Sequence, residues 1–144
     1  ERVKCMKKLN RRGFTLVELL AVIVIMGVIM SVAVAAVFVH LSNSRQQAME
    51  TIASSAYDGA VMYMMDNNIM LNKNQSIEIG IDQLYAENRI DRPGDPYKTS
   101  EECTGSVIVN NKTTDTTAGL EDYQYTVTVN CSGNHKTTQE YPKK

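Results

Sequence analysis

The order of apolar and polar residues divides the chain into three parts. Residues 19–39 contain no charged side chain and are apolar on every face of a helix. Residues 41–64 carry apolar side chains at mostly three- and four-residue spacing, which predicts an amphipathic helix. Towards the C-terminus the pattern alternates with a period of two, which predicts strands. No proline lies between Phe14 and Arg92, so we expect one long helix from Phe14 to about Asn68.

The amphipathic part of this helix is expected to pack on a small globular head, whereas the apolar part would lie outside it. The predicted contact stripe consists of Leu41, Met49, Ile52, Ala53, Ala56, Ala60, Val61 and Met64. We interpret the nearby methionines as side chains that fill gaps in the core. They are Met62, Met64, Met65 and Met70.

The alternating pattern predicts strands at 106–110 and 123–129, with an edge strand near 137–141. Two strands alone are marginally stable, so at least one more must join them. We expect residues 76–96 to form a connecting loop with a short helix at 82–88, whose Leu84 and Tyr85 would point inward. The predicted fold is therefore α+β, with a long N-terminal helix packed on a small antiparallel sheet.

Two cysteines agree with one pairing of these strands. In an antiparallel hairpin, the numbers of two residues that face each other add up to the same value along the whole hairpin. If Cys103 faces Cys131, then Val107 faces Val127 and Val109 faces Tyr125. All of these side chains then point to one face. We expect a Cys103–Cys131 disulfide, with two buried free thiols as the alternative.

The uncharged stretch at 19–39 has 21 residues, and a helix needs about 20 to cross a bilayer. The segment up to Gly13 carries a net charge of +5 and the rest of the chain −6, so the basic end should remain cytoplasmic and the acidic bulk outside. Such an acidic domain argues against a broad basic surface for nucleic acid. Glu18 is unusual, because a carboxylate at the entrance of a membrane span is costly without a partner.

The segment Gly13-Phe14-Thr15-Leu16-Val17-Glu18, between a basic leader and an apolar span, resembles the processing signature of type IV pilins and pilin-like proteins. The resemblance is close over residues 7–40. It implies that a prepilin peptidase cuts between Gly13 and Phe14 and that Phe14 becomes N-methylated. It also implies that Glu18 pairs with the terminal amine of a neighbouring subunit in a filament.

Two other interpretations fit part of this pattern. A secretory signal peptide would also have basic residues and an apolar core, and Ala33-Val34-Ala35 matches its cleavage site. Against it, Glu18 interrupts the start of the apolar region and the helical pattern continues beyond this site. A plain membrane anchor would make Glu18 an ordinary charge at the membrane surface.

These observations suggest three regions. Residues 1–13 would be the leader, residues 14–40 the helix of the membrane and the filament core, and residues 41–144 the amphipathic helix with its head. Met6 is a candidate first residue, in which case residues 1–5 would lie upstream of the native leader. Cys5 would be removed with the leader.

Small residues recur every fourth position inside the span. Gly27, Ser31 and Ala35 would let neighbouring helices approach closely, although ordinary span composition explains them equally well.

The sequence shows no arrangement of catalytic residues, and neither the cysteine nor the histidine spacing suggests zinc. We therefore expect no enzyme activity, no metal and no cofactor.

The resemblance implies a structural subunit of a type IV pilus, for adhesion or twitching motility. A pseudopilin of a type II secretion or DNA-uptake system is the alternative, and an anchored exported domain without a filament is a third. The implied partners are other copies of the chain, the prepilin peptidase, membrane lipid, and an assembly ATPase with its membrane platform. The protein would reside in the cytoplasmic membrane before assembly and in an extracellular filament afterwards.

The first prediction concerns processing. Mass spectrometry of the protein from cells should find a mature N-terminus at a methylated Phe14. Gly13→Leu should retain the leader, because a bulky side chain should not fit a peptidase site that takes glycine. A mature N-terminus at Ala36 or Val37 would instead indicate a secretory signal peptide.

Overall fold

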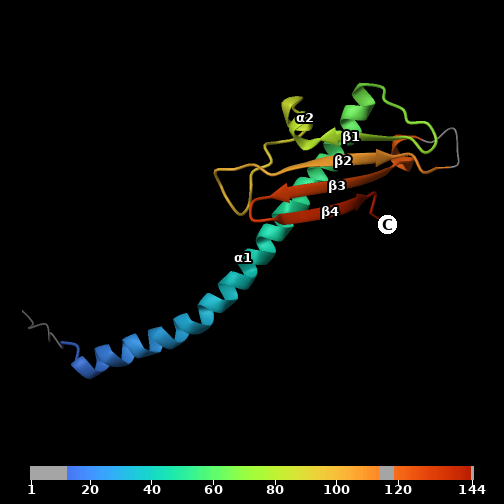
Figure 1. Cartoon of the computed structure of the whole chain (residues 1–144). Helices are drawn as coiled ribbons and strands as arrows, with labels where there is room; N and C mark the ends of the chain where they lie inside the picture. Colours follow the sequence, from blue (N-terminus) through green and yellow to red (C-terminus); the bar gives the residue numbers. More distant parts are fainter. Residues whose placement is uncertain (1–12, 114–118, 144) are drawn as a thin grey trace, which may run out of the picture. The chain divides into compact units, whose positions relative to one another are not determined.

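The computed structural model describes residues 13–113 and 119–143 (Figure 1). Its contacts divide the chain into two compact units, one ending at Leu41 and one beginning at Ser42. Helix α1, Leu16–Asp66, contributes to both units. The elements that follow α1 in the second unit are β1 (Ser76–Gly80), α2 (Ile81–Ala86), β2 (Thr104–Asn110), the 3-10 turn η1 (Leu120–Asp122), β3 (Gln124–Cys131) and β4 (His135–Tyr141). The α+β class predicted from the sequence is confirmed.

The sheet has four antiparallel strands in the order β1-β2-β3-β4 (Figure 1). Val107 pairs with Val127 and Val109 pairs with Tyr125, which confirms the predicted register. In β3 every second side chain, from Tyr125 to Cys131, is buried, so one face of the sheet belongs to the core. The edge strand predicted near 137–141 is β4, which begins two residues earlier than expected.

The part of α1 that belongs to the second unit covers the buried face of the sheet with a stripe of small and flexible side chains. The buried residues of the stripe are Met49, Ala53, Ala56, Gly59, Ala60 and Met64. At Gly59 an added Cβ would lie 2.6 Å from the side chain of Ile90, so only glycine fits this contact unchanged. The small side chains allow the helix backbone to lie close to the elements it packs against.

Two expectations about the stripe were wrong. Leu41 is exposed, and the buried stripe begins at Met49. Of the four methionines expected in the core, only Met64 is buried, and the others are more than half exposed (Met62, Met65 and Met70). Met62 and Met65 stand about 200° and 100° around the helix from Met64, so a helix that buries Met64 must turn them away.

The expectation of a loop over 76–96 was also partly wrong. Residues 76–80 form β1, which pairs with β2 and buries Ile79. The short helix is present as α2, and Leu84 is fully buried as expected, but Tyr85 is 42% exposed. Strand β1 is only five residues long, with two inward-facing isoleucines, so its alternation is too brief to be distinctive.

Buried hydrogen bonds hold the chain where it leaves α1. The helix ends at Asp66, two residues before the expected end, and Asn68 follows with a positive φ of 50°. The Tyr123 hydroxyl accepts a hydrogen bond from the backbone N–H of Leu71, and Asn111 Nδ2 donates to the carbonyl of Leu71 at 2.8 Å. These bonds satisfy backbone groups that would otherwise be buried without partners.

The second prediction tests the close approach of β2 to β3 at Gly105. Gly105 has a φ of +152°, and an added Cβ would lie 1.9 Å from the carbonyl oxygen of Thr128. We expect Gly105→Ala to destabilise the second unit by about 3 kcal/mol, because it adds both backbone strain and a clash with backbone. Thermal unfolding followed by circular dichroism measures the loss. Gly94→Ala is the matched control, because an added Cβ there meets nothing within 4 Å. Equal melting temperatures for the two variants would contradict the argument.

Candidate processing and assembly site

The peptide bond between Gly13 and Phe14 lies just before α1. Gly13, Phe14 and Thr15 are not helical, and the helix begins at Leu16. Phe14 is 81% exposed, and an added Cβ on Gly13 would meet nothing within 4 Å. A peptidase needs an accessible backbone outside regular structure, and this bond provides one. The basic residues and Cys5 of the expected leader lie outside the described residues.

Thr15 caps the first turn of α1. Its hydroxyl oxygen accepts a hydrogen bond from the backbone N–H of Glu18 at 3.3 Å, and its carbonyl accepts from Leu19 at 3.1 Å. Thr15 and Glu18 have the Thr-x-x-Glu spacing of a capping box. Glu18 also stands in the first helical turn, where the helix dipole favours a negative charge. Glu18 therefore has a local role in starting the helix.

The apolar part of α1 exposes its side chains on all sides. Every residue from Gly13 to Ser44 is exposed, and α1 is long and apolar enough to cross a membrane. Gly27, Ser31 and Ala35 lie one helical turn apart on this surface, with open space at Gly27. The hydroxyl of Ser31 donates to the carbonyl of Val28 at 2.7 Å, so this polar group is satisfied within the helix and is tolerated in lipid.

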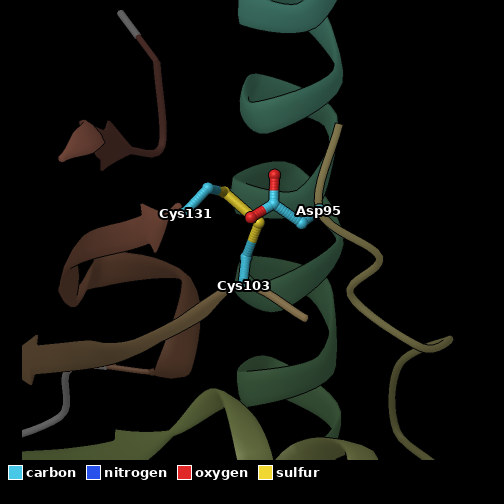
Figure 2. Close-up of side chains that lie close together, drawn as sticks. All are labelled: Asp95, Cys103 and Cys131. Carbon is cyan, nitrogen blue, oxygen red and sulfur yellow. A yellow bond between two sulfur atoms is a disulfide. The ribbon is translucent and has the colours of Figure 1, made fainter. Parts of the chain in front are cut away.

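In the second unit a disulfide joins Cys103, just before β2, to Cys131 at the end of β3. The two Cα atoms are 4.4 Å apart, and both residues are buried. Asp95 lies directly beside this bond (Figure 2), with its nearest carboxylate oxygen and both sulfur atoms within 4.8 Å of one another. Three groups of the kind that bind metals therefore meet at one point. Because both sulfurs are already bonded to each other, they do not form a metal site.

Asp95 is the buried acid that the sequence analysis did not identify as a site. Its Oδ2 accepts a hydrogen bond from the backbone N–H of Ser132 at 2.7 Å. Its Oδ1 accepts from the backbone N–H groups of Tyr97 and Lys98, at 2.7 and 3.2 Å. Burial raises the pKa of the carboxyl, but these hydrogen bonds more than offset burial, so the pKa of Asp95 lies below its ordinary value.

One signal in the sequence pointed to this role. Asp95 lies in the turn cluster Arg92-Pro93-Gly94-Asp95-Pro96, and aspartates in turns commonly accept hydrogen bonds from backbone two or three residues later. The bond to Tyr97 has this spacing. The contact with Ser132 spans 37 residues, and no local pattern predicts a contact of that range.

Two features define the class of protein. An apolar helix begins at an accessible, non-helical junction, and a head closed by a disulfide follows this helix along the chain. Comparison with protein families then matches residues 8–34 to the prokaryotic N-terminal methylation motif. The chain thus carries the signature of type IV pilins and prepilins, followed by a long apolar helix. Searches of curated proteins and of solved structures each returned no match.

The third prediction concerns Asp95 and pH. Asp95→Asn should destabilise the second unit by about 2 kcal/mol at pH 7, because charge-assisted hydrogen bonds from three backbone N–H groups to a buried carboxylate are lost. The folded-state pKa is lowered, so the stabilisation is present above the unfolded pKa of roughly 3.9 and is lost as pH falls through the folded value. The difference in melting temperature between the variant and the wild type should therefore shrink below about pH 4.

Asp91→Asn is the control for this experiment, because it removes the same charge from an exposed position in the same segment. Its melting temperature should follow that of the wild type at every pH. A constant difference for Asp95→Asn down to pH 2 would contradict the assigned pKa direction.

Proposed function

We propose that this protein is a prepilin that is cleaved after Gly13, N-methylated at Phe14 and polymerised into a type IV pilus through its apolar helix. The observation that carries the proposal is the methylation motif at residues 8–34, which includes the non-helical junction at 13–15 and the exposed first part of α1. We divide the chain into a leader at 1–13, a membrane and filament helix at 14–40, and a head at 41–144.

The exposed apolar surface of the helix supports this function, because either lipid or other helices must cover it. Its large hydrophobic side chains from Leu16 to Val39 are each between 43 and 80% exposed in the single chain. In a bilayer, lipid covers this surface. In a filament, helices of other copies would cover it, so leaving the membrane costs little once neighbours are present. Gly27, Ser31 and Ala35 provide a face on which such helices can approach closely.

Glu18 would fix the position of each subunit along the filament. Among the described residues the structure records no ion pair for Glu18, whose side chain is exposed near the start of the helix. Cleavage after Gly13 would create a positively charged amine at Phe14, and the same amine on a neighbouring copy would be the partner. A carboxylate within an apolar bundle is stable only near such a cation, so one axial position is favoured over the others.

We propose adhesion or twitching motility as the biological role of the filament. A pseudopilin of a secretion or DNA-uptake system would carry the same processing motif. Surface filaments that electron microscopy finds in cells with the gene, and not in cells without it, would support the pilus. A defect in secretion or transformation without any loss of surface filaments would support the pseudopilin. Assembly would require an ATPase and a membrane platform in either case.

The fourth prediction separates the two roles of Glu18. Glu18→Gln keeps a side chain that can complete a capping box but loses the charge, whereas Glu18→Ala loses both. If the charge selects the filament position, both variants should be processed and inserted but should reduce filament number at least about tenfold, since one lost ion pair of 1.4 kcal/mol already gives that factor. Immunogold counting of filaments and mass spectrometry of the N-terminus measure the two steps.

Phe14→Leu provides a matched control that alters the junction but keeps Glu18. It should preserve the amine–carboxylate pair and therefore the filaments. Normal filaments with Glu18→Gln but none with Glu18→Ala would show that Glu18 acts only as a helix cap, and the proposed pairing would be wrong.

A further inference from the structure

The structure places a negative charge directly beside the disulfide of the head. Asp95 is only 3% exposed, yet its lowered pKa keeps the carboxylate ionised at neutral pH. Three backbone N–H groups fix its position. Two of them, at Tyr97 and Lys98, precede Cys103 in the sequence, and the third, at Ser132, follows Cys131. Among the buried polar residues of the described chain, which are Asp95, Asn111 and Thr137, Asp95 alone carries a charge.

We propose that Asp95 protects the Cys103–Cys131 bond from reduction by thiolates. In that reaction a thiolate forms a bond to one sulfur, the Cys103–Cys131 bond breaks, and its electron pair leaves on the other sulfur as a second thiolate. The second thiol of a dithiol reductant then displaces the first cysteine, so that the reductant is oxidised to its own disulfide and both cysteines are reduced. Each step brings negative charge to the place where Asp95 already holds one.

Distance and burial make this repulsion strong. The carboxylate oxygen lies within 4.8 Å of both sulfurs, well inside the screening length of physiological salt, which is about 8 Å. Cys103 is 3% and Cys131 is 9% exposed, so an attacking group must lose much of its own hydration close to Asp95. The nearby ammonium group of Lys98 is paired with Glu101. Removing the Asp95 charge should therefore favour an anionic attacking group in particular.

The test compares two reductants of different charge on the full chain in an uncharged detergent. Dithiothreitol attacks as an anion, whereas tris(hydroxypropyl)phosphine attacks as a neutral molecule. Every variant carries Cys5→Ser so that this thiol takes no part in exchange. Samples are quenched with iodoacetamide over time, and mass spectrometry counts the alkylated cysteines. The quantity of interest is the ratio of the dithiothreitol rate to the phosphine rate, because any general opening of the head accelerates both reactions.

We expect Asp95→Asn to raise this ratio on the order of tenfold, as the removal of one nearby like charge predicts. Asp122→Asn is the matched control. Asp122 also accepts a hydrogen bond from backbone, at Gly119, but it precedes β3, whereas Cys131 ends that strand. Its ratio should equal that of the parent chain. An unchanged ratio in Asp95→Asn would overturn the proposal, whether both rates rise together or neither changes, because Asp95 would then act on stability alone.

Discussion

The exposed apolar surface of α1 is the constraint to which the rest of the molecule is adapted. Water does not tolerate a helix whose large side chains are exposed on every side over more than twenty residues, so lipid or other helices must cover them. The head must therefore fold without using this surface. It does so, because its core takes residues from α1 only from Met49 onward. The helix that anchors the protein thus also provides one wall of an independent core.

The head compensates for its small size by joining its elements at a few well-separated points. Tyr57 packs edge-on against Tyr125 and stacks on Tyr141, with ring centroids 5.0 and 4.7 Å apart. These contacts link α1 to β3 and β4. At the other end of β3, the disulfide and Asp95 link β2, β3 and the preceding loop. Small domains bury a low fraction of their surface, so crosslinks of this kind contribute a large share of their stability.

The sequence predicted those features that a regular pattern specifies. The alternation of valine and tyrosine with polar residues, together with the two cysteines, was sufficient for the register of β2 and β3. The same reasoning failed for β1, because two inward-facing isoleucines do not make a distinctive period. It failed for Met62 and Met65, because hydrophobic side chains near the end of a helix were assumed to follow the buried stripe.

The candidate site shows the same division. The processing junction and Glu18 were apparent from residue types at fixed spacing, and the family comparison matches that region. The hydrogen bond between Thr15 and Glu18 has the local Thr-x-x-Glu spacing of a capping box, so it too was predictable from the sequence. Asp95 was different in kind, because its importance depends on Ser132, which is distant in sequence. Only the folded chain shows that a turn aspartate and a disulfide lie together.

The loop between Asp95 and Cys103 is closed at its base. The N–H of Asp95 donates to the carbonyl of Glu101, and the N–H of Cys103 donates to the carbonyl of Pro93, so the two ends of the loop are tied before the chain enters β2. Thr99 and Ser100 at its tip are exposed and, unlike Lys98, donate no hydrogen bond to Asp95. Extending a loop whose ends are already fixed costs little entropy. This tip is consequently a position where evolution can vary surface sequence, or where an epitope can be inserted, without altering the sheet.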